Sequence, residues 1–197
     1  MGKIKHSFFK KNGLTIVFLV LMVGTLGLQT YTGWHESNTE REEKGLTQYT
    51  LKQYLGSGHF LQTTFENWES EFLQMALYVV FTAFLYQQGS AESKSLDEEE
   101  DVDREPVPHK DAPSPVRKGG WYLQIYQNSL SIAFFLLFII SFVVHAYGTM
   151  KNLNEEGKNI DLISTFGEST FWFESFQNWQ SEFLSVAAIV FLSIYLR

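Results

Sequence analysis

The sequence of 197 residues has no cysteine and only four prolines, and its acidic residues outnumber its basic ones. The lack of cysteine excludes disulfide frameworks, cysteine zinc sites, thiol catalysis and iron–sulfur clusters. With 15 Lys and Arg against 22 Asp and Glu, the net charge is -7, which argues against a nucleic-acid partner, since that role needs a basic face. No phosphate-binding loop, nucleophile elbow or zinc-helix motif is present. We therefore expect no cofactor, no metal site and no enzymatic activity.

Long uncharged apolar runs are the dominant feature of the chain. A helix of roughly 20 apolar residues is needed to cross a bilayer core of about 30 Å. Two runs meet this length alone, and two do so only when the Asn-Trp-x-Ser-Glu turn before them joins the helix. The sequence therefore predicts an all-α membrane protein with four transmembrane helices, at about residues 14–32, 67–86, 130–147 and 178–196.

Aromatic residues and lysines frame these runs. Tryptophans stand where the aromatic belt of a membrane protein lies, and we interpret them as interfacial anchors: Trp34, Trp68, Trp121 and Trp179. The apolar Tyr54–Leu55 and Phe171–Trp172–Phe173 stretches indicate interfacial segments in the two outer loops. The lysine-rich start also fits a secretory signal peptide; because no clean cleavage site follows, an uncleaved first helix is favoured.

The chain contains an internal repeat. Residues 65–85 match residues 176–196 at 10 of 21 positions with an offset of 111, and an offset of 116 pairs Gln29 with His145. Each half then reads as helix, loop and helix, which predicts two hairpins in the same orientation and a four-helix bundle. We divide the chain into a first hairpin, 1–86, a linker, 87–120, and a second hairpin, 121–197.

The linker differs in composition from both hairpins. It holds all four prolines and an acidic run between Asp97 and Asp103, so it cannot bury enough apolar surface to order itself and we expect it to be disordered. The termini and linker together carry ten Lys and Arg, against five in the two hairpin loops. The positive-inside rule then places both termini and the linker in the cytoplasm of a bacterial inner membrane.

A polar stripe follows helical spacing down the second predicted helix and recurs in the fourth. With two residues near the ends of the first and third helices, it predicts an outward-facing polar pocket, lined by Asn67, Ser70, Glu71, Gln74, Asn178, Ser181, Glu182, Ser185, Gln29 and His145.

Glu71 and Glu182 occupy equivalent places in the two copies. A carboxylate at membrane depth marks a functional site, but both glutamates also stand in the first turn of a helix if Asn67 and Asn178 are N-caps, where they would favour the helix dipole. His145 would titrate near neutral pH beside a carboxylate, or serve only as an interfacial hydrogen-bonding group.

The repeated motif carries a family resemblance. The segments at 12–14, 66–74, 88–94 and 178–184 resemble those of a family of small bacterial integral membrane proteins that is catalogued only as a domain of unknown function. The resemblance covers essentially the whole chain. It implies a four-helix bacterial membrane protein and supplies no activity, cofactor or catalytic residue.

Three functions remain open at this stage. The first is a non-enzymatic scaffold, envelope or partner-binding protein, whose partners are the lipid bilayer and either a second copy or another membrane protein. The second is a carrier or channel for a small cation or a proton-linked solute, using Glu71 and Glu182. The third, a membrane enzyme, would need His145 paired with one of these two glutamates.

Overall fold

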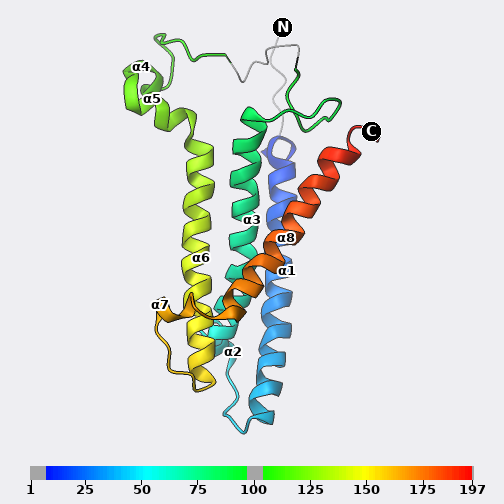
Figure 1. Ribbon diagram of the computed structural model, residues 1–197, viewed down its shortest axis with the longest axis vertical. Helices are drawn as coiled ribbons and strands as arrows, with labels where there is room; N and C mark the ends of the chain where they lie inside the picture. The colour runs from blue at the N-terminus through cyan, green and yellow to red at the C-terminus, as the bar shows by residue number, and fades with distance from the viewer. Residues whose placement is uncertain (1–7, 97–103, 197) are drawn as a thin grey trace.

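The computed structural model describes residues 8–96 and 104–196, and these residues form only helices, turns and irregular segments (Figure 1). The sequence prediction of an all-α protein is confirmed. The helices in chain order are α1 (Phe8–Glu43), α2 (Leu51–Tyr54), α3 (Gly58–Phe84), α4 (Ser114–Lys118), α5 (Gly120–Gln127), α6 (Ser129–Glu155), α7 (Leu162–Thr165) and α8 (Ser169–Leu192).

The long helices begin earlier than the hydropathy pattern places them. Ser57 is the N-cap of α3, where its hydroxyl accepts a hydrogen bond from the Phe60 amide, and Glu168 is the N-cap of α8. The first turns of both helices are therefore about nine residues ahead of the Asn-Trp motif. Asn67 and Asn178 lie inside the helices, so the interpretation of these residues as N-caps is wrong.

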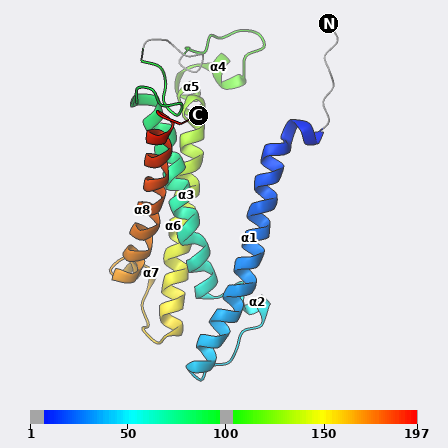
Figure 2. The same ribbon diagram turned by 90° about the vertical axis from the view of Figure 1, so that its right-hand side faces the viewer.

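Helices α3, α6 and α8 pack together, whereas α1 stands apart along most of its length (Figure 2). Contact between α1 and the others is confined to its C-terminal part. There Gly33 packs against the Tyr54 hydroxyl, and Gln29 Nε2 donates to Thr64 Oγ1 at 3.4 Å. The start of α1 and the end of α8 lie at one end of the molecule, and α2 and α7 lie at the other (Figure 1).

Two glycines allow α3 and α6 to approach closely. A Cβ atom on Gly148 would collide with the backbone of Leu61 and Gln62, and one on Gly58 would collide with the backbone of Lys151 and Asn152. Because side chains are absent at these crossings, the two backbones come into direct contact. This contact fixes the height of α3 against α6 next to His145.

Within residues 8–96 and 104–196, two helices, not four, have the length and apolar composition of a membrane span. The first is α1, whose most apolar 18-residue window has a mean hydropathy of 1.9 and no buried residue. The second is α6, whose window has a mean hydropathy of 2.4 and 17% of its residues buried. Helices α3 and α8 do not meet the same criterion, since each carries glutamates and amides through its first half. The prediction of four spans is therefore supported by composition for only two helices.

The predicted linker contains local structure. Helix α4 lies within it, and Ala112 and Val116 are buried, so the prediction of disorder does not hold for 112–118. The acidic run from Asp97 to Asp103 lies outside the described residues. The outer-loop segments also differ from expectation: Tyr54 and Phe171 are 1% and 0% exposed and pack inside the protein instead of lying at its surface.

Candidate functional site

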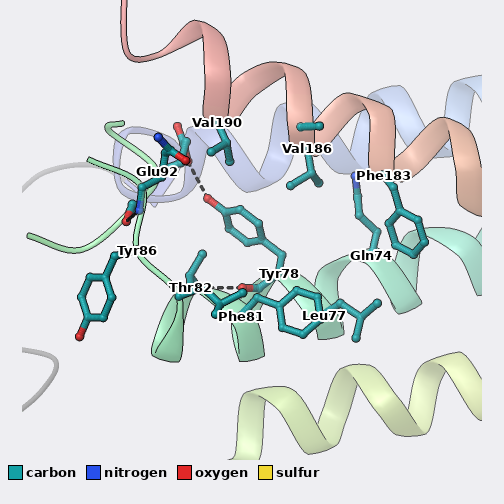
Figure 3. Close-up of a pocket in the computed structure, with 14 residues that line it drawn as sticks. Gln74, Leu77, Tyr78, Phe81, Thr82, Tyr86, Glu92, Phe183, Val186 and Val190 are labelled. Atoms are coloured by element: carbon teal, nitrogen blue, oxygen red, sulfur yellow. Dashed lines mark hydrogen bonds between the residues drawn. The ribbon is translucent and has the colours of Figure 1, made fainter. Parts of the chain in front are cut away.

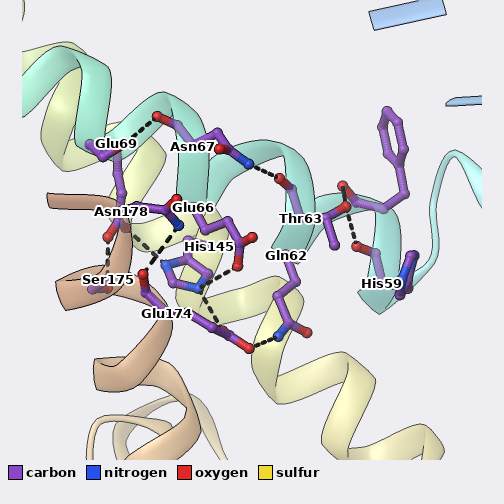
Figure 4. A network of polar contacts seen from close by, with 12 residues as sticks. His59, Gln62, Thr63, Glu66, Asn67, Glu69, His145, Glu174, Ser175 and Asn178 are labelled. Carbon is purple, nitrogen blue, oxygen red and sulfur yellow. Dashed lines mark hydrogen bonds and ion pairs between the residues drawn. The ribbon is translucent and has the colours of Figure 1, made fainter. Parts of the chain in front are cut away.

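A fully buried histidine lies where α3, α6 and α8 meet. His145, on α6, is 0% exposed and has a carboxylate beside each ring nitrogen (Figure 4). Its Nδ1 is 2.9 Å from Glu69 Oε2 on α3, and its Nε2 is 3.1 Å from Glu174 Oε2 on α8. The ring of Phe171 covers the imidazole at a centroid distance of 4.7 Å. One side chain of α6 thus joins all three packed helices.

Glu69 is held on both carboxylate oxygens. It is 0% exposed, Oε2 faces His145, and Oε1 accepts a hydrogen bond of 2.7 Å from the Ser175 hydroxyl of α8. A carboxylate can only accept hydrogen bonds, so the nitrogen facing Glu69 must carry a proton. The same rule applies to Nε2, which faces the Glu174 carboxylate at 3.1 Å, so without a metal ion both ring nitrogens donate and the imidazole is protonated.

Two further carboxylates, those of Glu66 and Glu174, lie on the Nε2 side of the imidazole. Glu174 Oε1 accepts a hydrogen bond of 2.6 Å from Gln62 Nε2, which orients the carboxylate. Glu66, on α3, brings Oε2 to 4.0 Å from His145 Nε2 and accepts no hydrogen bond from any described residue. The side chains of Glu66 and Glu174 are each 19% exposed, so this side of the cluster borders the surface.

The cluster carries an excess of negative charge. It gathers three carboxylates, Glu66, Glu69 and Glu174, around one imidazole, and in the described part of the chain their only ion-pair partner is His145. Charges removed from water are stable only when they are paired or neutralised. Neutrality therefore requires a further cation, either added protons or a metal ion.

The geometry suits a bound cation. One ligand atom each from Glu66, His145 and Glu174 lies within 4.8 Å of the other two. Hydrogen-bonded carboxylates behind the ligands, such as Glu69 behind the imidazole, are a regular feature of protein metal sites because they orient the histidine. The cluster can thus store protons or hold one metal ion at the end of the bundle.

The stripe predicted from sequence is separate from this cluster. Gln74 Nε2 donates to the Glu182 carbonyl at 3.0 Å and to Ser185 Oγ at 2.9 Å, joining α3 to α8. Glu71 is exposed and Glu182 is half-buried. His145 makes its polar contacts with Glu66, Glu69 and Glu174, so a dyad of His145 with Glu71 or Glu182 does not form.

The remaining predicted site residues bond mostly within their own helices. Asn67 and Asn178 donate to the carbonyls of Thr63 and Glu174 four residues back. Ser70 and Ser181 donate to the carbonyls of Asn67 and Asn178 three residues back. Gln29 is exposed and contacts Thr64. These side chains satisfy local backbone groups instead of lining one common pocket with His145.

The predicted tryptophan anchors have different surroundings. Trp34 Nε1 donates to the Tyr49 carbonyl at 2.6 Å, Trp68 packs on Phe65, and Trp121 is 61% exposed and stacks on Tyr122. Trp179 packs against Phe138 and Phe176, and its Nε1 is buried without a hydrogen-bond partner in the described structure.

A cavity of about 460 Å³ opens between α3 and α8, toward the end of the molecule where α3 and α8 end (Figure 3). Its walls are mostly apolar, with Phe81, Val186 and Val190 facing the space. Gln74 stands at one end, and Tyr78 donates a hydrogen bond of 2.7 Å to Glu92, which lies beyond the end of α3. The polar stripe on α3 therefore continues along this cavity beyond the middle of the helix.

The residues that complete the cluster escaped the sequence analysis. Gln62, Glu66 and Glu69 follow i, i+4, i+7 spacing, which places them on one face of α3, beside the stripe that was chosen. From the sequence alone, the charge of Glu69 looks dispensable, because the other copy of the repeat has Gln180 at the equivalent position. The structure overturns that interpretation, since Glu69 is buried and bonded whereas Gln180 is exposed.

Fold and site together define an all-helical protein with two candidate membrane spans and a buried histidine–carboxylate cluster. The chain belongs to the family described as "Domain of unknown function (DUF6766)", whose model matches residues 5–197. This agrees with the resemblance to a domain of unknown function found from the repeated motif. No curated protein and no solved structure matches the chain.

Proposed function

We propose that the protein is a multi-pass protein of the bacterial inner membrane that binds a ligand or partner at its outward-facing end and has no enzymatic activity. All four long helices cross the membrane as two parallel hairpins, with both termini and the linker in the cytoplasm. The end that carries α2, α7 and the histidine–carboxylate cluster faces outward.

The surface of α1 supports the membrane assignment. Its apolar side chains from Leu14 to Val23 are largely exposed, and no residue of its most apolar window is buried by the rest of the protein. Exposed apolar surface of this extent is unfavourable in water at roughly 25 cal/mol per Å². Lipid contact removes that cost, and it accounts for a helix that packs on the others only near one end.

The single observation that carries the binding role is the position of the cluster. Four ionisable side chains, two fully buried and two partly exposed, meet at one end of three packed helices. Removing their charges from water costs free energy that a bound ligand can offset. The catalytic alternative lacks support, because among the described residues His145 makes its polar contacts with Glu66, Glu69 and Glu174, and the dyad with Glu71 or Glu182 does not form.

Cysteine labelling tests the topology cleanly because the chain has no cysteine. Three single-cysteine variants are informative at exposed positions: Thr47→Cys and Ile163→Cys in the two outer loops, and Ser114→Cys in the linker. In spheroplasts, a membrane-impermeant maleimide should label the first two and spare the third until the membrane is opened. Labelling of Ser114→Cys in sealed spheroplasts would contradict the proposed topology.

The alternative function is a carrier for a small cation or a proton-linked solute, using Glu71 and Glu182. The cavity between α3 and α8 favours it, because Gln74 and Tyr78 continue the polar stripe along that space. Flux into proteoliposomes should then depend on an ion or proton gradient and fall in the Glu71→Gln, Glu182→Gln double variant. Absence of any gradient-driven flux in the parent protein would exclude the carrier.

A further inference from the structure

We propose that Glu66, His145 and Glu174 bind one divalent transition-metal ion, with Glu69 as the residue that orients the histidine. The proposal names a ligand class for the binding role above and rests on the same site. It departs from the sequence-based expectation of no metal, since the three ligands come from three different helices and form no local motif.

The first step of the argument concerns the histidine. Glu69 requires a proton on Nδ1, as shown by the 2.9 Å contact and the acceptor-only nature of a carboxylate. When an ion binds, it displaces the proton on Nε2, and the Nε2 lone pair then faces the ion between Glu174 and Glu66. Carboxylate, histidine and metal in this order make up a common arrangement in metalloproteins, where the carboxylate fixes the ring and raises its basicity.

The second step concerns Glu66. If His145 were only an imidazolium, its Nε2–H would be satisfied by Glu174 at 3.1 Å, and Glu66 at 4.0 Å would remain a half-buried carboxylate without a hydrogen bond. A metal ion placed among the three ligand atoms gives Glu66 a partner. Bonds of about 2.0 to 2.2 Å set neighbouring ligand atoms roughly 3 to 4 Å apart. The distances from His145 Nε2 to Glu174 and Glu66, 3.1 and 4.0 Å, lie in this range, and all three ligand atoms lie within 4.8 Å of one another.

The third step concerns charge and the neighbouring amide. Two positive charges on the ion offset most of the charge of the three carboxylates, which no described Lys or Arg pairs. Gln62 donates to Glu174 Oε1 through Nε2 and so orients this ligand beside the ion. One imidazole with two carboxylates suits Mn²⁺, Co²⁺ or Zn²⁺.

The experiment uses the full chain, purified in detergent and stripped with a chelator. Mn²⁺, Co²⁺ and Zn²⁺ are added singly, and binding is followed by titration calorimetry. The visible spectrum of bound Co²⁺ and the electron paramagnetic resonance spectrum of bound Mn²⁺ then report on the coordinating atoms. We expect saturable binding of at least one of these ions at one per chain, with nitrogen coordination visible in the spectra.

Variants separate the metal site from general effects on folding. Glu66→Gln keeps the shape of a side chain that makes no hydrogen bond, so the fold should persist while affinity falls at least about 10-fold. Glu69→Gln should lower affinity by about 10- to 100-fold through the histidine. The control is Glu43→Gln, an exposed glutamate at the end of α1 that belongs to none of the proposed sites, and it should bind as the parent does.

Three outcomes would overturn the proposal. The first is that none of the three ions shows saturable binding. The second is unchanged binding in Glu66→Gln, and the third is an equal loss of affinity in Glu66→Gln and Glu43→Gln. The first, combined with proton uptake that is lost on replacing His145, would identify the cluster as a proton site. Failure of metal binding leaves the labelling result untouched, so the membrane topology and the metal site can fail independently.

Discussion

At the scale of single residues, the cluster depends on a contact that only His145 supplies. Replacing His145 with Leu would leave Glu69 buried beside Ser175 alone, without the imidazole. Removing one partner of a buried charged pair costs about 3 to 5 kcal/mol. We expect His145→Leu to unfold at a clearly lower temperature in detergent, measured by far-UV circular dichroism.

The internal repeat offers a control for that variant. Gln29 is the equivalent of His145 in the first half, but it is exposed and makes one contact of 3.4 Å with Thr64. Gln29→Leu removes the same kind of group from a solvent- or lipid-facing position. Its melting temperature should stay near that of the parent, and an equal drop in both variants would argue against the cluster as the stabilising feature.

Asp161 gives a second prediction, in the loop outside the proposed spans. Hydrogen bonds from the backbone and side chain of Ser164 lower the pKa of Asp161, which caps α7. A carboxyl whose pKa is lower in the folded state stabilises the fold above its unfolded pKa and loses that contribution as the pH falls through the folded value. The α7 segment should therefore loosen below about pH 4.

Limited proteolysis of the α7 loop as a function of pH measures this effect. In Asp161→Asn the amide still accepts at the N-cap but does not titrate, so the rise in cleavage below about pH 4 should be smaller than in the parent. The same acid-induced rise in both proteins would show that another group controls the loop.

At the scale of helices, α3 and α6 are held together by glycine. Glycine in a helix is normally worse than alanine by about 1 kcal/mol. At Gly148 this preference should reverse, because a methyl group would meet the backbone of Leu61 and Gln62, and overpacking costs about 1 to 3 kcal/mol. Gly148→Ala should thus be destabilised in thermal unfolding.

Gly24 is the matched site for that substitution. It lies within α1, and a Cβ atom there would have nothing within 4 Å. Gly24→Ala should therefore melt at or above the parent temperature. If the two alanine variants behaved alike, the close approach of α3 and α6 at Gly148 would not be what fixes the helix register.

The sequence predicted the long helices well and the site only in part. The reason in both cases is that hydropathy reports on the apolar half of each helix and not on the polar half. Hydropathy marks the apolar half of each helix, so it found the four long helices but missed the polar first turns capped by Ser57 and Glu168. The repeat predicts two similar hairpins in one bundle, yet α3 packs on α6 while α1 stands apart. Glu69 and Gln180 share a repeat position but not a neighbour, and no pattern along one helix reveals partners that three helices supply.

At the scale of the whole molecule, the strongest packing joins the two repeats instead of the two helices of one hairpin. Helix α3 belongs to the first half, and its main partners, α6 and α8, belong to the second. The polar contacts follow the same division, since Glu69 binds His145 and Ser175, and Gln74 binds Ser185. Covalent continuity through the linker is therefore not what holds the halves together.

A protease site inserted in the exposed linker next to Lys110 tests this directly. After complete cleavage in mild detergent, an affinity tag on the first half should retain the second half in close to equal amount, because the contacts among α3, α6 and α8 remain. Adding His145→Leu to the same protein removes the central contact and should make the second half wash off more readily. Free separation of the parent halves after cleavage would mean that the packing among α3, α6 and α8 is too weak to define the bundle, and the shared cluster would then lack the scaffold it needs.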